Sequence, residues 1–231
     1  MKNSLFILLL SAFVLASSAV KAQNCEIYDD YREGSTIKSV YYDDKDKATG
    51  FTLTTVKEKK KDADGVSIQF QQNYNNYEDY SFESEFLIRC KNGEVIVDMQ
   101  KFIDPSSMTA YEGMEFEVSA DDLSIPENAS VGDELNGGTV TVSVNTGTPV
   151  KITIAVTLSN RVVAGKETVV TPAGTFECTK ITYDILSQIG FLKIKSSATE
   201  YYSKKDGVIK TETFNKKGKL SGYTIVEEIN N

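Results

Sequence analysis

Adjacent carboxylates are the residues of this sequence whose type and spacing come nearest to acid–base chemistry. They occur at Asp29-Asp30, Asp43-Asp44 and Asp121-Asp122. Hydrolysis of a glycosidic bond requires two carboxyl groups that face each other across a cleft. Neighbouring residues of a β-strand point to opposite faces of the sheet, so adjacency does not provide such a pair. We interpret the three pairs as solvated turn residues and rank a carboxylate hydrolase last among three functional hypotheses.

No histidine occurs anywhere in the sequence. This excludes Ser-His-Asp and Cys-His catalysis, and it excludes zinc sites that use histidine ligands. Patterns for phosphate-binding glycine loops and for the nucleophile elbow of hydrolases are also missing. The segment Asp62-Ala63-Asp64-Gly65 has part of a calcium loop but lacks the third oxygen ligand and the closing glutamate. We therefore expect a protein that is not an enzyme and that has neither a metal site nor a cofactor.

The sequence contains three cysteines, Cys25, Cys90 and Cys178. In an oxidising compartment three cysteines most simply form one disulfide and leave one buried thiol. Their spacing allows all three pairings. We favour Cys25–Cys90, which would attach the N-terminal segment to a strand. Cys178 lies in the strand-like segment FECTKITYD and is interpreted as a small core residue.

The N-terminal residues have the pattern of a secretory signal peptide. A short basic start precedes the apolar run from Leu5 to Val20, and small residues at Val20 and Ala22 suit cleavage before Gln23. We therefore predict a signal peptide at residues 1–22 and a protein exported to the periplasm or the cell surface. No later stretch is long and apolar enough to predict a transmembrane segment. The net charge of −8 argues against binding to nucleic acid.

The strongest indication of a ligand site is a group of apolar residues in the middle of the chain. Methionine is adaptable and suits a site that accepts apolar groups of different shapes. Three methionines occur there together with large apolar residues, and the candidate ligand-binding residues are Met99, Phe102, Ile103, Met108, Tyr111, Met114 and Phe116. They are expected to form a lid or mouth over a curved sheet. The alternative is ordinary core packing beneath a long crossover.

The elements that would position these residues are predominantly β-strands. The segment VKITIAVTL at 150–158 alternates apolar and polar residues, and Asn92-Gly93 and Asp206-Gly207 are among the turn signals. Strands are predicted near 35–42, 51–59, 66–73, 79–90, 94–100, 114–118, 139–145, 149–158, 161–170, 175–185, 192–203, 207–214 and 221–229. Few short helices are expected, with 98–107 and 183–189 as the candidates. The fold class is therefore mainly β, with each sheet burying one face.

One sequence motif occurs twice. The segment from Ile37 to Leu53 returns without a gap from Ile209 to Ile225, and both copies contain alternating apolar positions, a lysine-rich turn and a glycine. Each copy predicts a β-hairpin, and we expect one hairpin in each of two lobes. The lobes would belong to a single β domain at 23–231 and would be joined by an irregular crossover near 104–136.

Several motifs resemble a family of exported bacterial proteins of unknown function, often labelled TapB-like. They include Cys90-Lys-Asn-Gly93, the stretch from Pro172 to Cys178, and the hairpin from Glu200 to Glu212. The resemblance implies an open, strongly curved antiparallel sheet of the YmcC type, similar to the half-barrel of lipoprotein carriers such as LolA. It brings no catalytic residues, and it implies a concave apolar surface only loosely.

Two functional hypotheses follow from these patterns. The first is an exported, non-enzymatic protein that binds an apolar ligand, a lipid or a lipidated partner in a concave β-sheet. The second is a structural or protein-interaction module of the cell envelope without a ligand cavity, for which exposed strand edges would bind an envelope protein. The two hypotheses differ in whether the concave face of the sheet is empty or filled.

Overall fold

All strands of the described residues belong to one antiparallel sheet. The structure is a computed structural model that describes residues 26–231 except 63–64, 78–80, 104–107, 112 and 148–150. The predicted signal peptide and Cys25 therefore lie outside the described residues. The strands are β1 (Thr36–Asp43), β2 (Ala48–Asp62), β3 (Gly65–Asn75), β4 (Ser81–Lys91), β5 (Glu94–Asp98), β6 (Phe116–Ala120), β7 (Asp122–Pro126), β8 (Glu134–Leu135), β9 (Gly138–Val144), β10 (Ile152–Thr171), β11 (Gly174–Ile189), β12 (Leu192–Ser203), β13 (Gly207–Asn215) and β14 (Leu220–Asn230).

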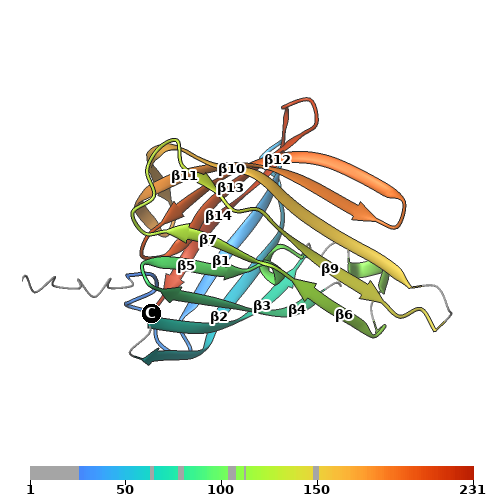
Figure 1. The fold of residues 1–231 in the computed structure, drawn as a ribbon, viewed down its shortest axis with the longest axis horizontal. Coiled ribbons are helices and arrows are strands. Elements are labelled where there is room, and N and C mark those ends of the chain that lie inside the picture. Colours follow the sequence, from blue (N-terminus) through green and yellow to red (C-terminus); the bar gives the residue numbers. More distant parts are fainter. Residues whose placement is uncertain (1–25, 63–64, 78–80, 104–107, 112, 148–150) are drawn as a thin grey trace, which may run out of the picture.

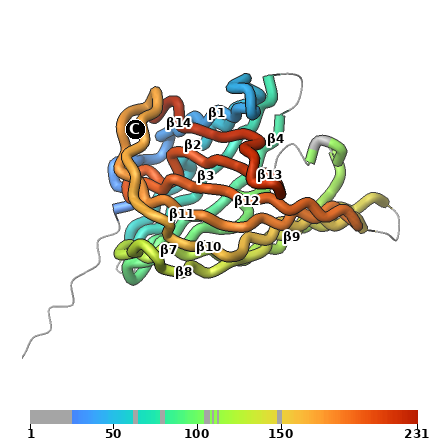
Figure 2. Tube along the Cα trace, turned by 90° about the horizontal axis from the view of Figure 1, so that it is seen from above, coloured from blue at the N-terminus to red at the C-terminus, as the bar shows by residue number. Residues whose placement is uncertain are grey.

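The sheet curls until its two end strands approach each other. The strand order is β6-β9-β10-β11-β12-β13-β14-β1-β2-β3-β4-β5-β7, and β8 pairs with β10. Figures 1 and 2 show the resulting shape, which is a nearly closed barrel with one unsealed seam. The two end strands, β6 and β7, follow each other directly in the sequence. The expected strongly curved antiparallel sheet of the YmcC type is thus confirmed.

Alternation along the strands explains how the core forms. In β3 the side chains of Val66, Ile68 and Phe70 are buried, and in β5 those of Val95 and Val97 are buried. The intervening residues are partly exposed, as expected for a sheet that buries one face. The period-two pattern of the sequence therefore gives the inner face of the sheet correctly at these strands.

Some strand boundaries differ from the prediction. The strands expected at 149–158 and 161–170 are one long strand, β10, which bends at irregularities between Ser159 and Val162 and between Val163 and Gly165. Two strands, β7 and β8, were not expected. The helix suggested at 183–189 is wrong because these residues belong to β11. The short helix suggested near 98–107 is present as the 3-10 turn η1 (Met99–Phe102), and a second turn, η2 (Thr109–Tyr111), follows.

The repeated motif forms two hairpins that lie side by side. The first copy is the β1–β2 hairpin and the second is the β13–β14 hairpin, and β1 pairs with β14. Tyr42 therefore lies opposite Tyr223, with the rings stacked at a centroid distance of 4.9 Å. The expectation of one hairpin in each of two lobes is not met, because the copies are neighbours in one sheet.

The residues shared by the two copies close the turns and let strands approach. Asp43 Oδ1 accepts hydrogen bonds from the backbone N–H groups of Lys45 and Lys47, both at 2.9 Å. Asn215 occupies the same place in the second copy and accepts from the N–H groups of Lys217 and Lys219. At the repeated glycine, a Cβ on Gly50 would lie 2.7 Å from the Asn75 carbonyl oxygen, and one on Gly222 would lie 2.6 Å from the Tyr42 carbonyl oxygen. The repeat is therefore architectural.

Side chains bridge the seam between β7 and the strands opposite it. Asn136 Oδ1 accepts a hydrogen bond of 2.7 Å from the Ser124 N–H, and Asn136 Nδ2 donates one of 2.9 Å to the Asp122 carbonyl. The guanidinium of Arg161, which is only 4% exposed, donates 2.7 Å and 3.3 Å bonds to the carbonyls of Asn136 and Ser124. These groups satisfy backbone atoms that a continuous ladder of hydrogen bonds would otherwise pair.

Within the described residues, no helix is long and apolar enough to cross a membrane.

Candidate functional site

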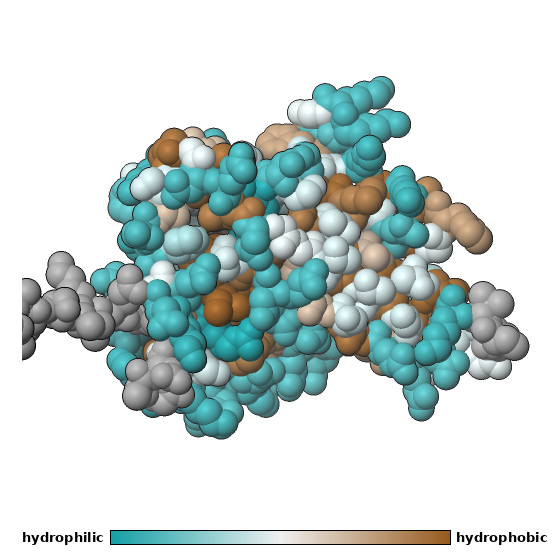
Figure 3. All heavy atoms as spheres, viewed as in Figure 1, coloured by the Kyte–Doolittle hydropathy of each residue, from teal (hydrophilic) through white to brown (hydrophobic). Residues whose placement is uncertain are grey.

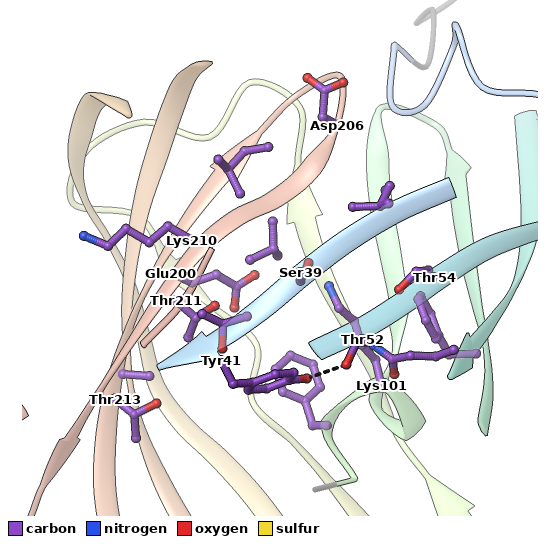
Figure 4. A pocket seen from close by; sticks show the side chains of 18 of the residues that line it. Ser39, Tyr41, Thr52, Thr54, Lys101, Glu200, Asp206, Lys210, Thr211 and Thr213 are labelled. Carbon is purple, nitrogen blue, oxygen red and sulfur yellow. Dashed lines mark hydrogen bonds between the residues drawn. The ribbon is translucent and has the colours of Figure 1, made fainter. Parts of the chain in front are cut away.

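The curled sheet encloses a cavity of about 310 Å³. Residues from β1 to β4 line one side of it, residues from β11 to β14 line the other, and the turn η1 contributes Lys101 and Phe102 (Figure 4). The concave face of the sheet is therefore not completely filled, and the strands that line the cavity come from the two ends of the chain. Pairing between β1 and β14 brings those ends together.

Hydroxyl groups dominate one part of the lining. Alternate residues of a strand share a face, so Thr52 and Thr54 both reach the cavity from β2, and Thr211 and Thr213 both reach it from β13. The hydroxyl-bearing residues of the lining include Ser39, Tyr41, Thr52, Thr54, Thr211, Thr213 and Thr224. Thr52 is buried and donates a hydrogen bond of 2.9 Å to Tyr41 Oη, drawn as a dashed line in Figure 4. This part of the cavity can bond to several polar groups of a ligand.

The rest of the lining is apolar. Phe86 and Phe102 lie on one side, and Ile185 and Ile209 come from the opposite strands. The cavity is consequently neither a purely apolar groove nor a polar channel. Its mixed lining is typical of small-molecule sites, in which a few polar groups fix the orientation of a ligand held by apolar contacts.

Glu200 on β12 is the buried carboxylate of the cavity. It is 7% exposed, and its Oε2 accepts a hydrogen bond of 3.1 Å from Tyr183 Oη on β11. Burial raises the pKa of Tyr183 well above its ordinary value, and the charge of Glu200 raises it further. Tyr183 therefore remains a protonated donor, which leaves Glu200 as the acceptor.

Lys101 and Lys210 are the two lysines of the cavity lining, and Lys210 forms an ion pair with Glu212, so Lys101 is the cation available to a ligand. Its ammonium group lies 5.9 Å from the centroid of the Phe86 ring. Burial lowers the pKa of Lys101, and the charge of Glu200 partly opposes this effect. Among the described residues Lys101 has neither a hydrogen-bond partner nor an ion-pair partner, and Figure 4 shows it reaching toward the interior. The cavity thus contains an ammonium group that is free to bind an acceptor from a ligand.

A second carboxylate of the lining, Asp206, belongs to the turn between β12 and β13. Its Oδ1 accepts a hydrogen bond of 3.2 Å from Tyr31 Oη, and its Oδ2 accepts one of 3.0 Å from Ser203 Oγ. These bonds hold the turn against the N-terminal segment. Burial and the charge of Asp206 both raise the pKa of Tyr31 above its ordinary range, which keeps this hydroxyl a donor.

The structure separates the apolar residues that the sequence grouped. Met99 is fully buried, and it packs so closely on Gly138 that a Cβ there would lie 2.8 Å from its Sδ. Phe102 lines the cavity. Met108 is buried in a separate cluster, against which Ile103 and Tyr111 pack. Met114 and Phe116 are exposed beside the edge strand β6. A common ligand-binding role for these residues remains a prediction, and only Phe102 among them lines the cavity.

Sequence reasoning did not identify the polar residues of the cavity. In the segment FTLT from Phe51 to Thr54, apolar residues alternate with threonines, so the pattern would place the threonines outside. The structure instead buries Thr52 and leaves Leu53 36% exposed. Lys101 and Glu200 look like ordinary charged residues in the sequence. Their position inside the curled sheet depends on pairings between distant strands, which no local pattern reports.

Asp121, Asp122 and Cys178 occupy positions in the structure that suit structural rather than catalytic roles. Asp121 Oδ2 accepts a hydrogen bond of 2.8 Å from the Thr139 N–H, and Asp122 forms an ion pair with Arg89. No group of residues in the described ranges could hold a metal ion. Cys178 is a free, buried thiol, as expected of a core residue. The pairing of Cys25 with Cys90 remains a prediction because Cys25 is outside the described residues.

Comparison with known proteins gives a family and a fold. A family model described as DUF3108-like matches residues 32–226. A crystal structure of a protein from Bacteroides fragilis, described as exported and as having a YmcC-like fold, superposes with a TM-score of 0.78 at 21% identity, covering 90% of this chain and all of the other. A protein from Parabacteroides distasonis, described as a lipoprotein, gives the same values. No curated protein matched in sequence. At such identities the structures show a shared fold alone.

Proposed function

The chain belongs to the DUF3108-like family. From the geometry of the cavity we propose that it is an exported, non-enzymatic protein that binds an amphiphilic small molecule in the interior of its sheet. Export is supported by the N-terminal sequence pattern and by the descriptions of the two proteins that share the fold.

The single observation that carries the proposal is the position of Lys101. The Lys101 side chain is partly exposed to the cavity, where its ammonium group loses part of its hydration and gains no compensating bond from a described residue, which costs free energy. In the cavity it faces hydroxyl groups and about 310 Å³ of space, and no described side chain pairs with it. A ligand with an anionic end would compensate this cost, which makes a carboxylate or phosphate the chemistry that fits best.

The apolar part of the lining supports an amphiphile rather than a free inorganic anion. Ile185 of β11 and Ile209 of β13 line the cavity. Phe86 of β4 and Phe102 of η1 also line the cavity. A hydrocarbon chain attached to the anionic end could therefore lie along this surface. A purely structural module with a filled interior would not require such an arrangement.

Titration calorimetry with dodecanoate, and with dodecanol as its uncharged counterpart, tests the proposal. We expect the purified protein to bind dodecanoate and Lys101→Met to bind it at least tenfold more weakly. Lys216→Met is the control, because Lys216 is exposed in the turn after β13 and should not affect binding. Unchanged affinity in Lys101→Met would refute the assigned role of this residue.

Blocking the cavity provides a second, charge-independent test. Thr54 and Thr55 are neighbours on β2, but only Thr54 lines the cavity. Thr54→Phe should abolish dodecanoate binding, whereas Thr55→Phe should not. Circular dichroism and urea unfolding would verify that both variants are folded. If neither variant affects binding, or if dodecanoate does not bind to the unmodified protein, the proposed function is wrong.

A further inference from the structure

We propose that the turn of the β11–β12 hairpin is a membrane-docking element that inserts into the surface of an anionic phospholipid bilayer. We define the hairpin tip as residues 189–195, which include the end of β11, the turn at Gly190 and Phe191, and the start of β12. The proposal does not depend on ligand binding in the cavity.

The hairpin tip exposes an unusual amount of apolar surface. Phe191 is fully exposed, at 105% of its reference area, and Leu192 and Ile194 are 59% and 49% exposed. Figure 1 shows the hairpin ending at the right-hand edge of the molecule, and Figure 3 shows brown, apolar side chains in the same place. Scattered single apolar residues need no explanation, but a contiguous group at a projecting tip is typical of an interaction site.

The charge of the segment indicates the kind of surface it would bind. The whole chain is acidic, with 33 Asp and Glu against 25 Lys and Arg. Between Asp184 and Glu200 there is no acidic residue, whereas Lys193 and Lys195 are both present and exposed. A local positive charge beside exposed apolar groups is complementary to anionic headgroups above a hydrocarbon layer.

The two kinds of side chain are arranged as an interfacial element requires. Leu192 and Ile194 lie on one face of β12, and Lys193 and Lys195 lie on the other. Lysine can keep its stem in an apolar layer while its ammonium group reaches the headgroups. With Phe191 at the turn, the hairpin could enter the bilayer end-on and leave both lysines at the level of the phosphates.

Both polar backbone groups of Gly190 in the turn are hydrogen-bonded within the protein. The Gly190 N–H donates a hydrogen bond of 2.9 Å to the Thr153 carbonyl of β10. The Gly190 carbonyl accepts one of 3.0 Å from the side-chain amide of Gln188. Backbone groups without partners are costly to move out of water, so these bonds lower the cost of placing the turn in a membrane.

A tryptophan reporter gives the most direct test because the chain contains no tryptophan. In Phe191→Trp the only indole would be at the hairpin tip. Val170→Trp is the matched control, since Val170 is 76% exposed and lies near the turn at the other end of β11. With vesicles of phosphatidylethanolamine and phosphatidylglycerol, the emission of Phe191→Trp should shift to shorter wavelength, and that of Val170→Trp should stay constant.

Co-sedimentation with the same vesicles separates the apolar and the ionic contributions. Phe191→Ser combined with Leu192→Ser should reduce vesicle binding at least tenfold. Lys193→Glu combined with Lys195→Glu should reduce it on phosphatidylglycerol vesicles, and high salt should weaken binding of the unmodified protein. Val170→Ser should bind like the unmodified protein.

Two outcomes would overturn the proposal. One is the absence of a spectral shift in Phe191→Trp together with equal sedimentation of all variants. The other is a concentration-dependent dimer, measured by sedimentation velocity, that the serine substitutions dissociate while vesicles bind none of the proteins. The second result would assign the hairpin tip to contact between copies of this chain. Far-ultraviolet circular dichroism on each variant would show that the sheet is intact.

Discussion

Tyr183 Oη donates a hydrogen bond of 3.1 Å to Glu200 Oε2 inside the curled sheet. Tyr183 lies opposite Ala198 on the neighbouring strand, so the bond runs diagonally to the next residue on the same face of β12. Both side chains are buried, and the bond fixes the carboxylate at the edge of the cavity. Its removal leaves a buried charge without its hydroxyl donor.

Tyr183→Phe is therefore expected to lower the free energy of unfolding by about 1–3 kcal/mol, the usual cost of leaving a buried charged acceptor unsatisfied. Tyr201→Phe is the control, because Tyr201 Oη donates a comparable 3.2 Å bond to Glu212, whose side chain is 24% exposed. Water can replace the lost donor at Glu212, so Tyr201→Phe should lower the free energy of unfolding by less than Tyr183→Phe does. Urea unfolding measures both values, and equal losses would contradict the assigned role of burial.

Asn136→Ala should open the seam. The substitution removes the acceptor of the Ser124 N–H and the donor to the Asp122 carbonyl. We expect faster hydrogen exchange at the Ser124 amide of β7 and a loss of about 0.5–1.5 kcal/mol in the free energy of unfolding, the usual net contribution of a hydrogen bond. Asn145→Ala is the control, since Asn145 Oδ1 accepts a bond from the Gly147 N–H in an exposed turn away from β7. Unchanged exchange in β7 would show that the seam does not depend on Asn136.

Gly207→Ala and Gly218→Ala compare two hairpin turns of similar backbone geometry. Both glycines have positive φ, +72° and +74°, which alanine adopts at a cost of about 1 kcal/mol. A Cβ on Gly207 would overlap the Tyr28 hydroxyl, whereas nothing lies within 4 Å at Gly218. We expect Gly207→Ala to lower the free energy of unfolding by about 2–4 kcal/mol, because Tyr28 must shift. Gly218→Ala should lower it by about 1 kcal/mol. Equal losses of unfolding free energy, measured by thermal or urea unfolding, would mean that Tyr28 moves aside without an energetic penalty.

Alkaline pH should destabilise the fold partly through Cys178. Burial, followed by the charge of Glu177, raises the pKa of Cys178 from 9.0 to about 12. The folded state therefore retains the thiol proton that the unfolded state releases. Its contribution to stability is fully present below about pH 9 and is lost as the pH rises toward about 12. In Cys178→Ser the free energy of unfolding should fall less steeply between about pH 9 and about pH 12. Urea unfolding at each pH measures this difference.

The thiol of Cys178 should also resist alkylation in the native protein. Iodoacetamide at pH 8 should label it only after unfolding in urea, because the thiolate is the reactive form. Peptide mapping without reduction would at the same time test the predicted pair of Cys25 with Cys90. Rapid labelling of native Cys178 would contradict its burial in the fold.

The sequence alone was sufficient for the strands that alternate cleanly. Ile68, Val97 and Val142 are buried where the period-two pattern places them. It also predicted both copies of the repeated hairpin, because turn residues such as Asp43 act on backbone groups only a few positions away. Such signals are local, and a short window of sequence contains all the interacting partners.

Pairing between distant strands determines the features that local sequence patterns do not predict, namely the order of the strands and the residues of the cavity. The neighbouring positions of β1 and β14 bring the two repeats together and place the hydroxyls of Thr52 and Thr211 in one cavity. The sequence grouped Met99 with Phe116, but the curled sheet buries Met99 and leaves Phe116 at an edge. Alternation tells which residues share a face of a strand. Only the order and curvature of the strands decide whether that face meets a core, a cavity or solvent.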